Sequence, residues 1–181
     1  GRPIPFASFA RMAVRPQDRM LVSTLTVVLR DKFDNIVMLD ANDGKGLVKV
    51  VGKDSLVGTL SATSYQGDGI YTAKVTSSKV GKDAFDFELS GQKANKDDVT
   101  VAYVAGVADA NQSEFTVIPA TITADGKQAS TLTVILKDRY GNAITSSLGK
   151  IVDIYALDTP IYKDLTTVVD NGDGTYKLSV K

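Results

Sequence analysis

Carboxylates dominate the residues of this chain that could take part in acid–base or metal chemistry. The sequence has 21 Asp and Glu residues but neither His nor Cys. Without His it lacks the commonest general base and metal ligand, and without Cys it has no thiolate nucleophile and no disulfide bond. A Ser triad or a zinc site would therefore need unusual members. We predict that the chain is not an enzyme and holds no cofactor and no metal.

One acidic segment is similar to the opening of a calcium-binding loop. The segment Asp40-Ala41-Asn42-Asp43-Gly44 places oxygen-bearing side chains at its first and third positions, as such loops do. The fifth position is Gly44 and the twelfth is Val51, where the loop requires an oxygen ligand and a bidentate Glu. The pattern therefore predicts a polar turn, with a weak cation site as the alternative.

Two Asp residues recur at equivalent places and resemble candidates for catalysis. Asp31 and Asp138 each follow an apolar run and precede a turn that contains Asn. Short acidic side chains in such places accept hydrogen bonds from the local backbone. We predict that both carboxylates have a structural role.

Two further polar clusters suggest no chemistry. Lys93, Lys96, Asp97 and Asp98 form a mixed-charge loop that is typical of a solvated surface. The segment Gly44-Lys45-Gly46 lacks the length and the following Ser or Thr of a phosphate-binding loop. The balance of 21 basic and 21 acidic residues also argues against a nucleic-acid partner, which would favour a basic excess.

An internal repeat organises the chain that must position these residues. The segment from Ser23 to Asn35 returns as Ser130 to Asn142, an offset of 107 residues, and Gly67-Asp68-Gly69-Ile70-Tyr71 returns as Gly172-Asp173-Gly174-Thr175-Tyr176. Two matches in the same order indicate tandem copies of one domain. The period is too long for a solenoid or propeller, whose repeats run about 20–50 residues.

Alternating apolar and polar residues predict strands in both copies. Leu25, Val27 and Leu29 alternate with Thr24, Thr26 and Val28, and Gly and Asp residues occur between such runs. The pattern predicts an all-β fold of tandem immunoglobulin-like β-sandwiches. The further predicted strands are Leu47–Val51, Gly58–Ser64, Ile70–Thr76, Ala84–Leu89, Val99–Val104, Ile151–Ala156, Asp164–Val169 and Thr175–Val180.

The repeated Gly-Asp-Gly-x-Tyr element predicts two structural tyrosines. Its Tyr stands near the start of a strand and is similar to the tyrosine corner of immunoglobulin-type sandwiches, where the hydroxyl bonds to upstream backbone. Tyr71 and Tyr176 would be these residues.

The predicted organisation has four parts. Residues 1–19 are an N-terminal segment or a first strand, residues 20–106 are domain 1, residues 107–112 are a short linker, and residues 113–181 are domain 2. The linker is too short and too apolar to be a flexible Gly/Ser chain, so we expect a stiff joint.

Domain 2 is predicted to be truncated at its C-terminal end. By the repeat, Lys181 corresponds to Thr76, so the second copy lacks the counterparts of residues 77–104. We expect either that the sequence cuts the domain short or that strands from another chain complete it. Sedimentation analysis tests this expectation, because a monomer with both copies resistant to protease would contradict strand exchange.

Motifs in and after the linker carry a family resemblance. They resemble the group 1 bacterial Ig-like domain that is repeated in the passenger regions of intimins and invasins. The motifs are Val104-Ala105-Gly106, Asp109-Ala110, Ser113, the run Pro119 to Lys127, Ser130 to Val134, Lys137-Asp138 and Gly141-Asn142.

The resemblance implies a fragment of an inverse-autotransporter adhesin on a Gram-negative cell surface. In that family a β-barrel anchors the protein in the outer membrane, and Ig-like domains extend outward as a stalk that projects a binding tip. The function expected here is that of stalk or spacer domains, with a host-cell protein or glycan bound by other domains. The alternatives are that one domain itself binds a host protein or glycan, for which Phe6, Phe9, Phe85 and Phe87 are the places to look, or that the chain is an accessory module of a secreted enzyme. Phe85 and Phe87 share a strand face, so we expect these two to be core residues.

Overall fold

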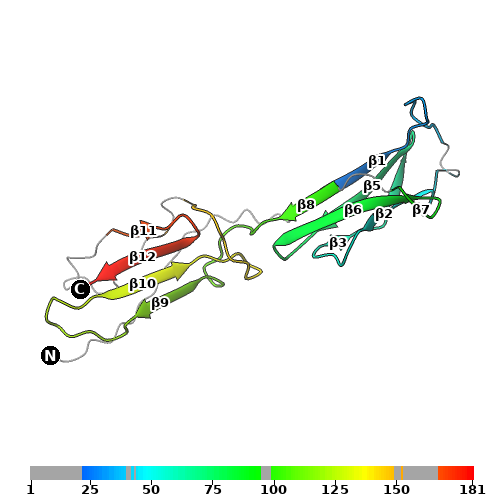
Figure 1. Cartoon of the computed structure of the whole chain (residues 1–181). Helices are drawn as coiled ribbons and strands as arrows, with labels where there is room; N and C mark the ends of the chain where they lie inside the picture. Colours follow the sequence, from blue (N-terminus) through cyan, green and yellow to red (C-terminus); the bar gives the residue numbers. More distant parts are fainter. Residues whose placement is uncertain (1–21, 40–41, 43, 95–98, 149–151, 153–166) are drawn as a thin grey trace. The chain divides into compact units, whose positions relative to one another are not determined.

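The described part of the chain consists of strands, turns and loops. The computed structural model describes residues 22–39, 42, 44–94, 99–148, 152 and 167–181 (Figure 1). No helix occurs among these residues, and none of them therefore forms a helix that could cross a membrane. Two compact units divide between Val104 and Ala105. We call the described residues from Val22 to Val104 the first unit and those from Ala105 onward the second unit. The all-β prediction is confirmed.

Two antiparallel sheets build the first unit. One sheet contains β1 (Ser23–Val28), β5 (Ile70–Thr76), β3 (Thr59–Leu60) and β4 (Ser64–Gly67), and the other contains β2 (Val48–Gly52), β6 (Gly81–Leu89), β7 (Gln92–Lys93) and β8 (Val99–Tyr103). Leu25 and Val75 of the first sheet share a buried cluster with Val50 and Phe85 of the second. The two sheets therefore pack face to face around one core, as in a β-sandwich.

One described sheet forms the second unit. Its order is β11 (Val169–Asp170), β12 (Thr175–Val180), β10 (Ser130–Ile135) and β9 (Glu114–Ile118), and Figure 1 shows the three longer strands side by side. Leu132 and Leu178 are buried on one part of this sheet, and Leu136 and Tyr176 are buried on another.

The two copies share the same strand register. In the first unit β1 pairs with β5 so that Val27 faces Tyr71, and in the second unit β10 pairs with β12 so that Val134 faces Tyr176. Both tyrosines retain about 1% of their surface exposed. A slip of one residue would turn every side chain of a strand to the other face, so equal registers place the repeated residues in equal environments.

The strand predictions hold best where the alternation is clear. Strands β5 and β12 have the predicted bounds, whereas the predicted strand Gly58–Ser64 divides into the short strands β3 and β4. Strands β7 and β9 were not among the predicted strands. Most residues of the predicted strands Ile151–Ala156 and Asp164–Val169 lie outside the described residues.

The missed strand β7 depends on a turn rather than on hydrophobic alternation. Its residues are polar and exposed, and they pair with the end of β6. Ser90 and Gly91, which join the two strands, have φ values of 51° and 80°. Two successive residues with positive φ form the tight hairpin turns that match the twist of paired strands.

The predicted linker lies within the second unit. Ala108 is only 3% exposed and belongs to the core cluster of that unit, and the amide of Asp109 donates to the carbonyl oxygen of Lys137 at 2.8 Å. The predicted domain boundaries, the stiffness of the joint and the truncation of domain 2 stay predictions.

Glycines of the repeated Gly-Asp-Gly motif allow close backbone packing. Gly69 and Gly174 precede β5 and β12 and have φ values of +69° and +80°. A Cβ on Gly69 would lie 2.4 Å from the carbonyl oxygen of Val37, and one on Gly174 would lie 2.0 Å from that of Ile144. No side chain fits at these two positions, so the motif requires glycine for space as well as for conformation.

We predict that Gly174→Ala destabilises the second unit much more than Gly172→Ala. Both glycines have φ near +80°, so each substitution carries the cost of about 1–2 kcal/mol for a left-handed residue. Only Gly174 also has a carbonyl in the way, since nothing lies within 4 Å of a Cβ on Gly172. Urea unfolding, followed at the NMR signals of Tyr176, measures the difference. Equal losses of stability would contradict the packing role of Gly174.

Candidate functional site

A buried carboxylate organises the turn that follows β10. Asp138 is 2% exposed and accepts hydrogen bonds on both oxygens. Its Oδ1 accepts from the amides of Tyr140 and Asn142, each at 2.9 Å. Its Oδ2 accepts from the Asn142 side chain and from the amide of Gly106, also at 2.9 Å each. The carboxylate thus closes its own turn and holds the segment that leads into the second unit.

The equivalent carboxylate of the first unit closes its turn in the same way. Oδ1 of Asp31 accepts from the amides of Phe33 and Asn35 at 2.8 and 2.9 Å, and Oδ2 accepts from the Asn35 side chain at 3.1 Å. Asp31 is exposed, however, and among the described residues no backbone amide donates to its Oδ2 as the amide of Gly106 does to that of Asp138. The geometry of both turns agrees with the predicted structural role of Asp31 and Asp138.

Hydrogen bonding decides the charge state of these carboxyls. Burial alone would raise the pKa of Asp138, but hydrogen bonds from the Asn142 side chain and from the amides of Gly106, Asn142 and Tyr140 outweigh it and lower the pKa. The hydrogen bonds of Asn35 lower the pKa of Asp31 as well. A carboxylate that is kept ionised by fixed donors is a poor proton acceptor, so neither residue is suited to general base catalysis.

A second buried carboxylate, which the sequence analysis missed, holds the end of the first unit. Asp83 is 3% exposed and accepts hydrogen bonds from the amides of Val57 and Gly58 at 2.8 and 2.9 Å and from the Tyr103 hydroxyl at 2.8 Å. Burial would raise the pKa of Asp83, but these three donors together lower it. Burial and the contact with Asp83 raise the pKa of Tyr103 to about 12. The network ties the last residue of β8 to the loop before β3.

Tyr71 pins a distant loop to the core of the first unit. Its hydroxyl donates to the carbonyl oxygen of Gly44 at 2.7 Å, and its ring centroid lies 4.8 Å from that of Tyr65. The Tyr65 hydroxyl donates to the carbonyl oxygen of Leu39 at 2.5 Å. Burial raises the pKa of Tyr71 and keeps its hydroxyl protonated, as a donor requires.

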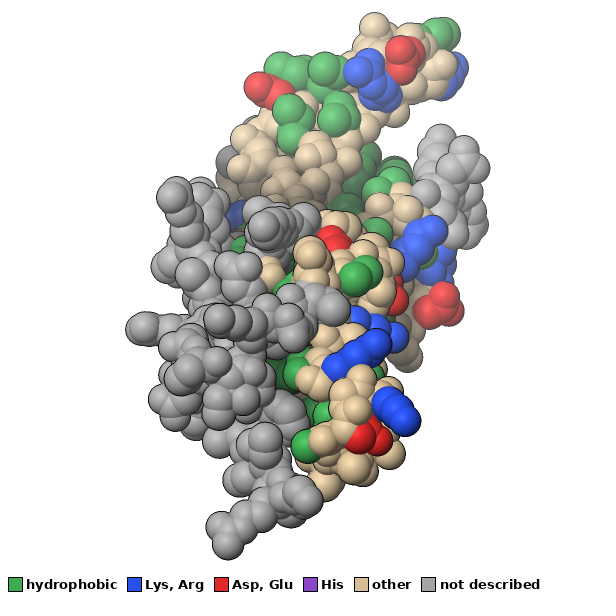
Figure 2. Space-filling model, turned by 90° about the vertical axis from the view of Figure 1, so that its left-hand side faces the viewer, with side chains coloured by type: hydrophobic (Ala, Val, Ile, Leu, Met, Phe, Trp, Pro, Cys, Tyr) green, Lys and Arg blue, Asp and Glu red, His purple; other side chains and the backbone are tan. Residues whose placement is uncertain are grey.

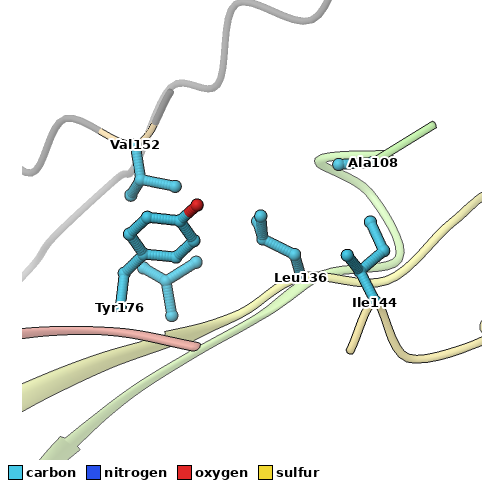
Figure 3. Close-up of a cluster of buried hydrophobic side chains, with 6 residues drawn as sticks. Ala108, Leu136, Ile144, Val152 and Tyr176 are labelled. Atoms are coloured by element: carbon cyan, nitrogen blue, oxygen red, sulfur yellow. The ribbon is translucent and has the colours of Figure 1, made fainter. Parts of the chain in front are cut away.

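Tyr176 has the corresponding place in the second unit. Figure 3 shows its ring beside Val152, with Leu136 between it and the pair formed by Ala108 and Ile144. The amide of Leu148 donates to the Tyr176 hydroxyl at 3.4 Å. Both tyrosines thus contact backbone 27 or 28 residues upstream, rather than the few residues of a usual tyrosine corner. Their assignment as tyrosine-corner residues stays a prediction.

The remaining predicted features do not converge on one site. Asp40, Ala41 and Asp43 of the calcium-like segment lie outside the described residues, and so do Phe6, Phe9 and the loop residues Lys96, Asp97 and Asp98. Lys93 is exposed on β7. Among the described residues no group of three or more acidic side chains could hold a metal ion.

The two phenylalanines of β6 are core residues rather than a binding patch. Phe85 is 2% exposed and lies in the buried cluster between the two sheets of the first unit. Phe87 is half-buried and packs against the cluster around Tyr71. These two side chains therefore do not form an exposed binding patch.

In the view of Figure 2, the described surface has no large patch of side chains of one charge. Lys and Arg side chains alternate there with Asp and Glu side chains and with hydrophobic ones. A hollow on the first unit is lined by Val51, Gly52, Lys53, Asp54, Asp86 and Lys93, which bring two positive and two negative charges together. Such a balanced surface does not favour a strongly charged partner.

A family model matches both halves of the chain. The model, described as "Invasin, domain 3", matches residues 17–106 and again residues 109–181. The two matches coincide with the two copies of the internal repeat.

Solved structures of bacterial surface proteins share the fold. InvD of Yersinia pseudotuberculosis has 29% identity and a TM-score of 0.52 over 87% of this chain and 43% of that chain. The structure described as "invasin: a bacterial integrin-binding protein" has 24% identity and a TM-score of 0.60 over 87% of this chain and 30% of that chain. The Escherichia coli adhesin FdeC has 23% identity and a TM-score of 0.54 over 99% of this chain and 56% of that chain. The chain thus spans 30% to 56% of the length of these structures.

We predict that Asp138→Asn weakens the second unit at neutral pH and that the effect shrinks in acid. The folded-state pKa of Asp138 lies below its unfolded value of about 3.9, so its contribution to stability is complete above that value and is lost as the pH falls through the folded pKa. At pH 7 the loss should be about 1.5–3 kcal/mol, the usual contribution of a hydrogen-bonded charge.

The measurement is urea unfolding at pH values from 7 to 2.5, followed at the NMR signals of Tyr176. Asp31→Asn, in the exposed equivalent turn, serves as the matched control and should change the stability of its unit less. A difference between wild type and Asp138→Asn that does not vary with pH would contradict the assigned role.

Proposed function

Because the chain belongs to the invasin domain 3 family, that is, to the Ig-like domains of intimin and invasin adhesins, we propose that its two units are spacer domains in the stalk of a bacterial surface adhesin. Their task is to carry a binding tip away from the cell. In this proposal the parent protein is anchored in the outer membrane, and the two units belong to its extracellular passenger region.

The repeat of one structural unit is the observation that carries the proposal. Each unit has its own core and its own tyrosine-centred cluster, and both use the same strand register. Domains that bury their own core can be joined in series without depending on one another. A series of such domains gains length with each copy, which is the property that a stalk needs.

The short connection between the units supports a spacer role. Strand β8 ends at Tyr103, whose hydroxyl donates a hydrogen bond to Asp83. In the second unit, the amide of Gly106 donates a hydrogen bond to Asp138. Only Val104 and Ala105 lie between these two fixed points. We infer a joint with limited bending, because so few residues can change their backbone angles.

The host-cell partner in this proposal is a protein or glycan that other domains of the parent bind. One of the similar structures is described as an integrin-binding protein and another as an adhesin, and both are much longer than this chain. The balanced charge and the absence of His and Cys give the units themselves no evident means of catalysis. An accessory role in a secreted enzyme has no specific observation in its favour.

A second candidate function is direct binding by the first unit. Phe33, Ile36 and Met38 are 73%, 45% and 69% exposed on the turn after β1. Neighbouring exposed apolar side chains are a common feature of protein interaction sites. This turn, rather than Phe85 and Phe87, is where a ligand of this unit would be sought.

Replacement of the two units in the bacterial adhesin tests the spacer function. We expect that deletion of residues 20–181 reduces adhesion to host cells, because the binding tip comes closer to the bacterial surface. Two unrelated Ig-like units of the same total length should restore adhesion, because a spacer contributes length and not sequence.

The control for the second candidate is Phe33→Asp with Met38→Asp in the otherwise natural adhesin. A spacer should tolerate this double substitution without loss of adhesion. If both the replacement and the double substitution abolish adhesion while the protein still reaches the surface, the first unit is a binding module and the spacer proposal fails.

A further inference from the structure

The turn between β11 and β12 contains a reactive dipeptide. Asn171 is followed by Gly172, and it is the only asparagine of the sequence that precedes a glycine. An asparagine side chain can react with the backbone nitrogen of the next residue to form a five-membered succinimide ring, which makes asparagine one of the thermally least stable residues. A side chain on the next residue hinders this attack. The sequence of this turn therefore favours the reaction more than that of any other asparagine in the chain.

The nitrogen that would attack is sterically open. Asn171 and Gly172 are both exposed. Gly172 has a φ of +81°, and no described atom lies within 4 Å of the position that its Cβ would take. The missing Cβ thus removes the main steric obstacle between the side chain of Asn171 and the peptide nitrogen of Gly172.

An ionised carboxylate accepts the hydrogen bond of this nitrogen. The amide of Gly172 donates to Oδ1 of Asp170 at 2.8 Å. Hydrogen bonds from the Ser147 side chain and from the Gly172 amide lower the pKa of Asp170, so its carboxyl is ionised at neutral pH. A negative acceptor draws the proton away from the nitrogen, which must lose that proton to solvent before it can attack. The contact with Asp170 therefore favours the first step of the reaction.

The carboxamide that would be attacked is held in the same turn. Nδ2 of Asn171 donates to Oγ1 of Thr175 at 2.8 Å, and this hydroxyl donates to Oδ1 of Asp173 at 2.5 Å. Asn171 therefore belongs to the exposed turn and is not drawn into the core of the second unit. Both reacting groups are ordered within a few residues of each other.

We propose that Asn171 is a modification site at which the folded chain deamidates spontaneously. The amide nitrogen of Gly172 loses its proton to solvent and bonds to Cγ of Asn171, and ammonia leaves with a proton from solvent. Water then adds to the succinimide, and cleavage of one of its two ring C–N bonds leaves either aspartate or isoaspartate. In sum, one carboxamide and one water give one carboxylate and one ammonium ion, so the reaction needs neither an oxidant nor a reductant.

The first unit has a natural control at the equivalent place. Gln66 and Gly67 stand where the second copy has Asn171 and Gly172. Gln66 is exposed, and Gly67 has a φ of +99° with no described atom within 4 Å of its Cβ position. A glutamine must close a six-membered ring and fix one more side-chain bond, which makes its cyclisation slower. The modification is therefore specific to the second unit.

Modification changes the turn beside the strand that carries Tyr176. The amide of Asn171 donates to the carbonyl oxygen of Thr175 at 3.0 Å, and Asp170 pairs with Tyr176 across β11 and β12. Isoaspartate adds one carbon to the main chain of this turn. Aspartate replaces the donor to Thr175 by a further negative charge near Asp170 and Asp173. Both products weaken the turn, so the second unit loses stability with the age of the protein.

Peptide mass spectrometry of the stored chain tests the proposal. The whole chain is kept folded in neutral buffer, and samples are digested with trypsin at successive times, with a sample at time zero to correct for modification during digestion. The tryptic peptide 164–177 contains Asn171, and the peptide 54–74 contains Gln66. We expect peptide 164–177 to gain the mass of an NH2-to-OH exchange and to divide into aspartate and isoaspartate forms, which electron-transfer fragmentation distinguishes. Peptide 54–74 should stay unchanged.

Three variants examine the chemistry. Gly172→Ala should slow the modification by about tenfold or more, which corresponds to about 1.4 kcal/mol in the activation free energy. Asp170→Ala should slow it severalfold, because the acceptor of the Gly172 proton is lost. Asn171→Gln, the residue of the first unit, should abolish it, and this variant keeps the test valid if the other two do not fold.

Urea unfolding of the stored wild-type chain measures the consequence. As the modified fraction rises, the midpoint followed at the NMR signals of Tyr176 should fall, whereas the midpoint at those of Tyr71 should not change. Asn171→Gln stored for the same time should keep its original midpoint.

Two outcomes would overturn the proposal. One is that Asn171 gains no more mass than Asn111 and Asn142 during the same storage. The other is that Asn171 is modified in the urea-unfolded chain but not in the folded one, because the turn would then protect it. Neither outcome depends on adhesion, so the spacer function is tested separately by the replacement experiment.

Discussion

The contact between a glycine and a returning turn is the constraint on which both units depend. Gly69 and Gly174 carry no side chain at the point where the carbonyls of Val37 and Ile144 come within van der Waals distance. That contact brings the end of one strand onto the start of its antiparallel neighbour. The contact occurs beside the strand pairs whose register buries Tyr71 and Tyr176.

The carboxylate-centred turns build on this contact. A chain of hydrogen bonds leads from Gly174 through Leu136 to Ile144, and Asp138 closes the loop between them. In a chain without disulfides, these polar contacts accompany hydrophobic packing as the means of fixing one arrangement of the loops. They lie at the same place in each unit, although the first unit leaves its carboxylate exposed.

Sequence reasoning succeeded where the structural cause is local or repeated. The alternation in Ile70–Thr76 and Thr175–Val180 gave both strands with correct bounds, and the repeat located Asp31 and Asp138 beside their turns. Sequence reasoning missed the hydrogen bonds of Asp83, because the donors Val57 and Gly58 are 26 and 25 residues away and no local sequence pattern predicts them. It expected the tyrosine hydroxyls to bond to upstream backbone but did not identify the acceptor, which for Tyr71 is the carbonyl oxygen of Gly44, 27 residues away. Long-range hydrogen bonds depend on how the sheets pack, and that packing is determined by many residues together rather than by one local motif.

The position of Gly106 on Asp138 has a mechanical consequence. When the chain is stretched, tension that arrives from the first unit meets the charge-assisted bond at Asp138 and the bond from Asp109 to Lys137 before it reaches the sheet. Behind them, β10 and β12 are joined by six residue pairs along their length, so that sliding one strand past the other must break several bonds together. Under flow or traction the short segment Ala105–Asp109 would detach first and lengthen the chain slightly, before β10 slides past β12.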